Sequence, residues 1–390
     1  MYSVDAFSGC GGFTSGMVES KIDVVSAIDF YKPAYETYQF NFGNHVTCGD
    51  IKKSEFYDQF IQRAKKFNVY LVCGSPPCQG FSLAGLRDII DKRNFLVKYY
   101  FKVVKDLHPR AFLMENVPGI LSSRLLVDKY DEKLFQYFFI ESQLKKQKMR
   151  HRHVKNDVEL ERVRYWENAL EQYKAVYGIT GDFITKNTIP VIDYISEISR
   201  KLGYEIAIKK LNAVDFGVPQ CRGRVFIFGI KKEMKINPSF PFPDHASIVT
   251  RTMFGKNMEL FTTVRQAIDD LKDAIENEEF SHVFSHHDDQ FLEKIKNTKI
   301  GESVFPKFKQ AYYRVKPDHP SPTVTENHHG IFIHYEKDRL LSCRELARLQ
   351  TFKDSFKFIG KKSSILKLIG NAVPCLLAEK LTGHVKSLLE

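Results

Sequence analysis

The stretch YSVDAFSGCGGFTSGMVESKIDVVSAIDF, residues 2–30, predicts a strand, a glycine-rich turn, a short helix and a second strand. Its two apolar ends are strand-like, and the segment between them has the length of one short helix. The alternation continues with a helix over residues 32–42, the strand NVYLVC at 68–73, a helix from about 92 to 107 and the strand RAFLMEN at 110–116. Strands joined by helices require right-handed crossovers and a mainly parallel sheet. The first half of the chain is therefore predicted to be doubly wound α/β.

Composition narrows the class of protein. At 390 residues the chain suits one large domain with a smaller companion. Its net charge of +11 and pI near 9.1 favour a polyanionic partner such as nucleic acid, although basic proteins are common. Seven scattered cysteines predict no disulfide framework and fit a reducing cytosol. No zinc-type spacing, signal peptide or bilayer-length apolar run is seen, so we expect no metal site and no membrane partner.

Ligands of doubly wound sheets bind outside the carboxyl ends of the strands, and several features fall there. The glycines of FSGCGG, residues 7–12, let the backbone approach a ligand, and the following helix offers free NH groups. Asp29 ends the second strand, where a carboxylate can bind ribose hydroxyls, and Phe30 could lie against an adenine ring. The carboxylate of Asp50 could accept a hydrogen bond from an exocyclic amine of the ligand. Without a phosphate clamp, this pattern favours S-adenosylmethionine over NAD or ATP, while a tight turn and a helix N-cap stay open for the glycines and Asp29.

GSPPCQGFS, residues 74–82, places Cys78 in a rigid turn directly after an apolar strand. Pro76 and Pro77 fix two consecutive backbone angles, and Gly80 leaves room for a close approach. A thiol attacks as the thiolate, so a catalytic cysteine needs a backbone that aims it and neighbours that ionise it. Cys78 is the best candidate nucleophile, although an isolated Pro-Pro-Cys is more often an inert turn.

Glu115 follows the apolar run RAFLM at the end of another strand. We expect its carboxyl group to be partly buried, which suits an acid that works near neutrality. The alternative is a structural salt bridge to a neighbouring arginine.

Two arginines begin a further strand in FGVPQCRGRVFIFGI, residues 216–230. Alternation puts Arg222 and Arg224 on one face, opposite Val225 and Ile227. Paired guanidinium groups could hold an anion, a carbonyl oxygen or a thiolate, although surface charges at a sheet edge are the default.

These segments together resemble the cytosine-5 DNA methyltransferases. The shared segments keep the family's order and span nearly the whole chain: FSGCGG, AIDF, the Gly-Asp at 49–50, PPCQGFS, ENVPG, FGVPQCRGR, RELARLQTF and IGNAVP. The resemblance implies a doubly wound, mainly parallel sheet of the S-adenosylmethionine-dependent methyltransferase type, with a smaller irregular target-recognition domain. It implies methylation of carbon 5 of a specific cytosine in duplex DNA, by a restriction-modification or orphan enzyme.

The resemblance also implies roles for five residues. Cys78 adds to carbon 6 of cytosine and makes carbon 5 electron-rich. Glu115 contacts ring nitrogen 3 and the exocyclic amine and supplies a proton, while Asn116 supports the loop. Arg224 contacts the base carbonyl, and Arg222 contacts the catalytic loop region. Loss of the proton at carbon 5 and expulsion of Cys78 then regenerate the enzyme.

By the same similarity, ten residues line the pocket for S-adenosylmethionine, which leaves as S-adenosylhomocysteine. Two of them come from a carboxyl-terminal segment that returns to the first strand. The ten are Phe7, Gly9, Gly11, Asp29, Phe30, Asp50, Ile51, Pro77, Asn371 and Val373.

Such chemistry requires the target base to leave the duplex, which costs a few kcal/mol. The loop from Gln79 to about Arg93 is expected to close over the DNA, because its glycines permit movement and its arginines can reach phosphates. The residues expected to contact DNA are Gln79, Ser82, Arg87 and Gln220.

We expect a catalytic and cofactor-binding domain over residues 1–231, a target-recognition domain over 232–340, and a hinge and return over 341–390. The recognition region includes an expected helix at TTVRQAIDDL, residues 262–271. Its basic residues could neutralise phosphates or simply be solvated. They are Lys294, Lys296, Lys299, Lys307, Lys309 and Arg314.

Residues from about 121 to 190 depart from the family pattern and suggest an ordered, helical insertion. They include KKQKMRHRH, residues 145–153, with five lysines or arginines and no acid. We expect an auxiliary DNA contact there, with a solvated helical face as the competing interpretation.

Two rival functions remain open. The first is methylation of transfer RNA, which one branch of the family carries out, although PPCQGFS is closer to the DNA branch. The second is a catalytically silent DNA-binding regulator, although such a protein would usually have lost Cys78 or Glu115. The expected partner is duplex DNA, with a cognate restriction endonuclease as a further candidate. We expect a cytoplasmic monomer, associated with the nucleoid if bacterial.

Overall fold

The computed structural model describes residues 1–390 except 78–88, 91–93, 128–130, 255–257, 306–310 and 327–331. The chain forms two compact units. The core unit comprises Met1–Ser75, Val103–Glu115 and Glu205–Glu390, and the helical unit comprises Pro76–Lys102 and Asn116–Tyr204.

A seven-stranded sheet organises the core unit, in the order β3-β2-β1-β4-β5-β9-β8. The first five strands pair in parallel, which confirms the predicted doubly wound fold. Lys231 N donates to Arg110 O, so the end of β9 lies beside the start of β5 and β9 runs against the other strands. The strands are β1 Tyr2–Ala6, β2 Asp23–Asp29, β3 Val46–Cys48, β4 Val69–Gly74, β5 Ala111–Asn116, β8 Tyr204–Asn212 and β9 Gly223–Lys231.

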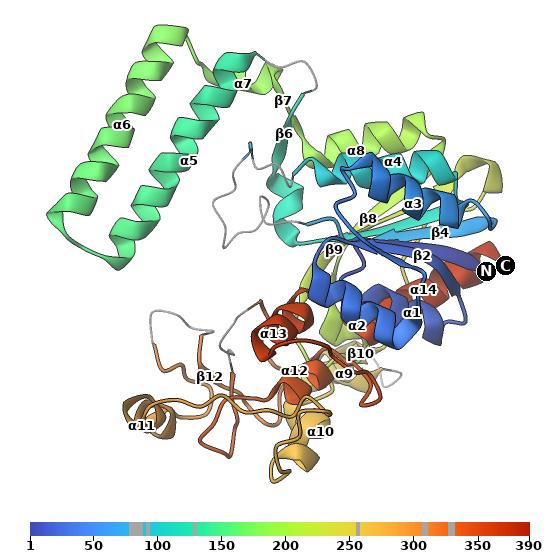
Figure 1. The fold of residues 1–390 in the computed structure, drawn as a ribbon, viewed down its shortest axis with the longest axis vertical. Coiled ribbons are helices and arrows are strands. Elements are labelled where there is room, and N and C mark those ends of the chain that lie inside the picture. The colour runs from blue at the N-terminus through green and yellow to red at the C-terminus, as the bar shows by residue number, and fades with distance from the viewer. Residues whose placement is uncertain (78–88, 91–93, 128–130, 255–257, 306–310, 327–331) are drawn as a thin grey trace. The chain divides into compact units, whose positions relative to one another are not determined.

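Helices cover both faces of this sheet, with α1, α2 and α14 on one face and α3 on the other (Figure 1). The contact between α1 and α14 depends on a glycine: a Cβ on Gly16 would lie 2.4 Å from Glu379 N. This packing brings the carboxyl-terminal segment against the first helix. The bounds are α1 Gly12–Glu19, α2 Lys32–Phe42, α3 Ser54–Ala64, α4 Leu96–Leu107, α12 Cys343–Leu349, α13 Lys362–Asn371 and α14 Cys375–Leu389.

The described part of residues 232–342 in the core unit contains only short elements. Their apolar side chains, among them Val264, Ile268 and Phe332, join a buried cluster with Leu346 and Phe352. The expected helix at 262–271 is shorter than predicted and ends in a 3₁₀ turn. The elements are η3 Lys232–Met234, β10 His245–Ala246, α9 Ile248–Phe254, β11 Glu259–Leu260, α10 Val264–Ile268, η4 Asp269–Leu271, α11 Asp289–Asn297, β12 Tyr313–Arg314 and β13 Phe332–Ile333.

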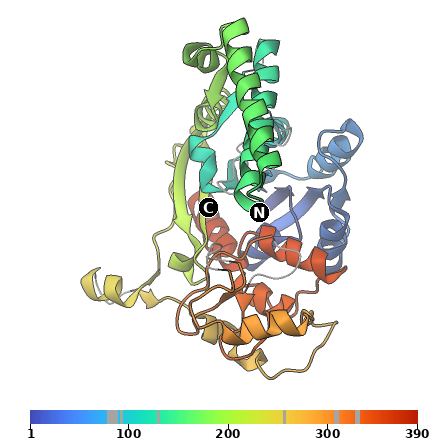
Figure 2. The ribbon, with the colours of Figure 1, turned by 90° about the vertical axis from the view of Figure 1, so that its left-hand side faces the viewer.

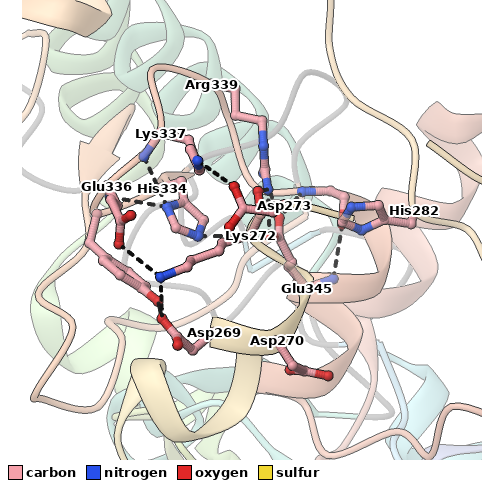
Figure 3. A network of polar contacts seen from close by, with 12 residues as sticks. Asp269, Asp270, Lys272, Asp273, His282, His334, Glu336, Lys337, Arg339 and Glu345 are labelled. Atoms are coloured by element: carbon pink, nitrogen blue, oxygen red, sulfur yellow. Dashed lines mark hydrogen bonds and ion pairs between the residues drawn. The ribbon is translucent and has the colours of Figure 1, made fainter. Parts of the chain in front are cut away.

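A buried polar network ties this irregular region to α12 (Figure 3). The two terminal guanidinium nitrogens of Arg339, Nη1 and Nη2, each lie 2.8 Å from an oxygen of the fully buried Glu345 carboxylate. Burial lowers the pKa of His334 to about 4, and its Nδ1 accepts from the backbone NH groups of Glu336 and Lys337. The neutral imidazole and the ion pair therefore fix residues 332–340 against the helix.

The helical unit is dominated by an antiparallel hairpin of two long helices, α5 Glu132–His153 and α6 Asp157–Tyr177 (Figures 1 and 2). Leu144, Val163 and Leu170 belong to its own apolar core. The insertion is thus folded and helical. The other elements are η1 Pro118–Ser122, β6 Arg124–Leu126, α7 Gly181–Lys186, β7 Thr188–Pro190 and α8 Val191–Lys201. Within the described part of the chain, no helix could cross a membrane.

Candidate active site

The glycine turn between β1 and α1 has the backbone that the sequence predicted. Phe7, Gly9 and Gly11 all have positive φ angles, of 59°, 55° and 97°. A Cβ on Gly11 would lie 2.3 Å from Cε2 of Phe42, so only glycine fits there. The turn leaves an open backbone at the start of α1, which suits the close approach of a ligand.

Asp29 organises this turn. Its Oδ2 accepts from Gly9 N at 2.9 Å, and its Oδ1 accepts from Tyr31 N at 2.8 Å. Burial raises the pKa of Asp29, while these two NH groups act in the opposite direction. Beside it, Phe30 is 67% exposed and available to an aromatic ring. The remaining acceptor capacity of the carboxylate suits a pair of hydroxyl groups.

The third strand end adds Asp50 and Ile51. Asp50 Oδ1 accepts from Lys52 N at 3.0 Å, and Lys52 Nζ lies 3.3 Å from Oδ2. Ile51 is buried, so it can supply an apolar wall.

The carboxyl-terminal segment meets the glycine turn at the start of α1. A Cβ on Gly12 would lie 2.4 Å from Val373 O, so these backbones touch. Asn371 is exposed, and its Nδ2 donates to Glu326 Oε2 at 3.0 Å.

Sequence reasoning missed Lys367. Its Nζ lies 4.8 Å from the centroid of the Tyr31 ring and 3.4 Å from Glu326 Oε1, and its charge helps to lower the pKa of Asp29. Only the fold brings α13 to β2, and no local motif marks this lysine.

Glu115 and Arg224 form an ion pair, with 3.0 Å between Oε1 and Nε. Their side chains are 11% and 14% exposed, so the pair is mostly shielded from water. The contact with the guanidinium group is made by Oε1. The carboxylate can therefore face a ligand while Arg224 holds its other oxygen.

Asn116, the next residue, fixes the segment before Cys78. Its Nδ2 donates to Pro76 O at 3.1 Å, and its Oδ1 accepts from Val117 N. Pro77 is half buried. Four predicted site residues, Cys78, Gln79, Ser82 and Arg87, lie outside the described residues, as does most of the expected loop at 79–93.

Arg222 is not the surface charge that the sequence left open as its default, and its expected contact with the catalytic loop falls mostly on residues outside those described. It is almost fully buried, and it donates to the backbone oxygens of Val324, Gly370 and Ala372 at 2.8–3.0 Å. Strand β9 is also buried on both faces instead of one. Arg222 therefore cross-links chain segments in the core unit, and we assign it a positioning role.

Gln220 and Arg314 correct two further expectations. Gln220 is fully buried, and its amide bonds Leu349 O, Gln350 Oε1 and Val324 N, which leaves no path to DNA. Arg314 is buried too and donates to the backbone oxygens of Ile295, Thr298 and His334. Interior hydrogen bonds, not phosphates, satisfy both side chains.

The parallel strands gather the rest of the site at one edge of the core unit. Strands β1, β2, β3, β4 and β5 all run in the same direction, so the glycine turn, Asp29, Asp50 and Glu115 lie at or just beyond their carboxyl ends. Cys78 stands four residues beyond Gly74, the last residue of β4. The turn that suits a nucleoside ligand and the paired carboxylate of Glu115 thus lie at the same edge of the sheet.

Comparison with known proteins identifies this arrangement. The model of the C-5 cytosine-specific DNA methylase family matches residues 1–138 and 182–387. The type II methyltransferase M1.HphI of Haemophilus parahaemolyticus is 30% identical, over 98% of this chain and 86% of its own length. The type II methyltransferase M.DdeI of Desulfomicrobium norvegicum is 28% identical, over 99% of this chain and 88% of its own length.

A crystal structure of an E. coli prophage-encoded protein, assigned as a DNA modification methyltransferase, has the same fold. Its TM-score is 0.67 at 23% identity, covering 100% of this chain and 99% of that one. The fold and the site thus define an S-adenosylmethionine-dependent methyltransferase. The chain belongs to the C-5 cytosine-specific DNA methylase family, and it methylates carbon 5 of cytosine in DNA.

The residues present fit the cofactor of this reaction. At Gly9 no atom lies within 4 Å of the position of a Cβ, so the turn keeps open backbone there for a ligand, while Gly11 and Gly12 pack against Phe42 and Val373. Asp29 offers carboxylate oxygens, and exposed Phe30 offers an aromatic face.

Proposed function

We propose that the enzyme methylates one specific sequence in duplex DNA through a covalent bond between Cys78 and the target cytosine. The carrying observation is the shielded pair of Glu115 and Arg224, at the end of the strand next to the one that precedes Cys78. A carboxyl group held in this way suits proton exchange with the Watson–Crick edge of an extruded cytosine.

Each step assigns a task to a residue of this chain. The Cys78 thiolate adds to carbon 6, while Glu115 provides the proton that ring nitrogen 3 accepts. Arg224 binds the carbonyl oxygen of the base and keeps Glu115 in place. Carbon 5 takes a methyl group, which S-adenosylmethionine supplies when bound. A water molecule then takes the proton from carbon 5, which expels the Cys78 thiolate and restores the double bond, and ring nitrogen 3 returns its proton to Glu115.

The glycine turn, Asp29, Phe30, Asp50, Ile51, Pro77, Asn371 and Val373 would hold the cofactor. Asp29 would bind the ribose hydroxyls and Phe30 the adenine ring, which fits their exposure and their free acceptor capacity. Gln79, Ser82 and Arg87 would contact DNA, and residues 232–340 would read the sequence.

The names of the relatives support a role as the modification enzyme of a type II restriction-modification system. The cognate partner would then be an endonuclease of the same specificity. We propose that the enzyme acts as a monomer in the cytoplasm, on nucleoid DNA if the host is bacterial.

Methyl transfer to different nucleic acids tests this proposal. Purified enzyme with labelled S-adenosylmethionine is expected to label duplex DNA, and sequencing should place every 5-methylcytosine in one sequence context. Transfer RNA should remain unlabelled. Labelling of transfer RNA alone, or of cytosines without a shared context, would contradict it.

A further inference from the structure

The α5–α6 hairpin has no part in the reaction described above. The family match ends at residue 138 and resumes at residue 182, so most of the hairpin lies outside it. The hairpin is nevertheless well built: Asn156 Oδ1 caps α6 by accepting from Glu159 N, and Gly178 ends α6 in the left-handed conformation. A folded arm with no task in the reaction is a candidate binding element.

The end of the arm carries an excess of positive charge. Residues 145–164 hold eight lysines and arginines against three carboxylates. The hairpin neutralises part of this charge itself, because Lys145 pairs with Glu141 at 2.8 Å and Lys148 pairs with Glu167 at 2.7 Å. Arg162 pairs with Glu159 at 2.7 Å.

Five of the eight cations keep no such partner, and four of these five lie around the turn between α5 and α6. Each is exposed, and its side chain forms no ion pair or hydrogen bond with another residue that the structure describes. We call these four residues the hairpin tip: Lys146, Arg150, Arg152 and Lys155. Lys146 and Arg150 are four residues apart on α5, so they lie one above the other on the same helix face.

Apolar surface accompanies these charges. Met149, Val154 and Tyr165 are 45%, 53% and 66% exposed. Alkyl and aromatic groups among arginines are typical of surfaces that lie along a nucleic-acid backbone, where they contact sugars while guanidinium groups bind phosphates. A purely solvated face would gain nothing from them.

We propose that the hairpin tip binds phosphates of the duplex DNA substrate without reading its sequence. This inference rests on the proposed function, which makes duplex DNA the substrate. Helix α5, with 22 residues, is about 33 Å long, which equals the length of about ten base pairs of duplex. The tip can therefore contact phosphates far from the point where the hairpin begins. Because the hairpin has its own apolar core, the helices that carry the cations are folded before DNA arrives.

The test compares two variants of the full-length enzyme with equal charge loss. The tip variant carries Lys146→Gln, Arg150→Gln, Arg152→Gln and Lys155→Gln. The control carries Lys65→Gln, Lys66→Gln, Lys232→Gln and Lys235→Gln, beside the start of β4 and the end of β9, opposite the edge that holds the site. DNA affinity is measured by fluorescence anisotropy at several salt concentrations, on duplexes with and without the methylated sequence.

The tip variant is expected to bind both duplexes about 10- to 100-fold more weakly. The slope of log K against log salt should fall by about 0.9 for each phosphate that the variant no longer binds. The control should change far less. Methylation at saturating DNA should be unchanged in both variants, so failure of the reaction itself is recognised separately.

Equal losses of DNA affinity in the two variants would overturn the inference, because general electrostatic attraction between a basic protein and DNA would then explain both losses. A loss confined to the duplex that carries the methylated sequence would also overturn it. So would a tip variant with unchanged DNA binding and an altered oligomeric mass, which would assign the tip to a second copy of the chain. Circular dichroism checks that the tip variant keeps its helices.

Discussion

Arg224 Nε lies 3.0 Å from Glu115 Oε1, across the end of two adjacent strands. The sequence left open whether Glu115 is a catalytic acid or half of a salt bridge, and the structure shows that it is paired. The two interpretations are compatible, because one carboxylate oxygen can hold the arginine while the other meets the base.

The first prediction concerns this pair. Glu115→Gln should lower the single-turnover rate of methyl transfer by about 10²- to 10⁴-fold, the usual contribution of a positioned acid. Arg224→Ala should cost a similar amount, and the double variant should lose little more, because the two residues act as one unit. Arg110→Ala, at the far end of β5, is the control and should keep the wild-type rate. Additive losses would show that the two side chains act separately.

The second prediction concerns Asp29 and the glycine turn. Asp29→Ala removes the acceptor for Gly9 N and Tyr31 N, and charge-assisted hydrogen bonds are worth about 1.5–3 kcal/mol each. Calorimetry should show binding of S-adenosylmethionine weakened by at least 10-fold, with DNA affinity little changed. Asp23→Ala, at the exposed start of the same strand, should bind the cofactor normally. Equal affinities for the cofactor in all three proteins would remove Asp29 from the pocket.

The third prediction concerns the contact between α1 and α14. Gly16→Ala places a Cβ 2.4 Å from Glu379 N and 2.5 Å from Ala378 Cβ, so the helices must separate. Overpacking of this kind should lower the free energy of unfolding by about 1–3 kcal/mol, measured by urea denaturation. Gly181→Ala, where nothing lies within 4 Å of the new Cβ, is the matched control and should not destabilise the protein. If Gly16→Ala leaves the free energy of unfolding unchanged, the two helices can separate without cost and their close contact does not stabilise the fold.

The fourth prediction is a pH dependence that comes from Asp5. Burial raises the pKa of Asp5 from 3.8 to about 7, although Thr14 Oγ1 donates to its Oδ2. Between these values the folded chain keeps a proton that the unfolded chain has lost, so the free energy of unfolding falls as pH rises through this window. From pH 5 to pH 8, the loss of unfolding free energy that is due to Asp5 is about 3 kcal/mol.

Asp5→Asn should remove that part of the slope, while Asp58→Asn, at an exposed position of α3, should leave it intact. Urea denaturation at both pH values provides the measurement. If Asp5→Asn and the wild type lose the same stability between pH 5 and pH 8, another group must carry the dependence.

Local patterns predicted the elements that local forces determine. The helix at 32–42 has its expected bounds because Pro33 suits the first turn and Gly43 follows the last one. The glycine turn and Asp29 were predicted for the same reason, since a strand end and a tight turn are marked by adjacent residues. The order of parallel strands then brings them together.

Long-range contacts explain what the sequence did not reveal. Arg222 looked like a site arginine, yet its carbonyl partners come from residues 324, 370 and 372. Lys367 carries no local signal and reaches Tyr31 only through the packing of α13. Gln220 lies within a conspicuous motif, but burial against Gln350 decides its role.

The most direct measurement of the central claim uses duplexes in which 5-fluorocytosine replaces cytosine. Fluorine at carbon 5 cannot leave as a proton does, so the addition product should persist. Incubation with S-adenosylmethionine should yield a denaturation-resistant complex whose peptide map places the DNA on Cys78, and Cys78→Ala should yield none. If an enzyme that methylates ordinary DNA forms no adduct, or forms it at another residue, covalent catalysis by Cys78 is wrong.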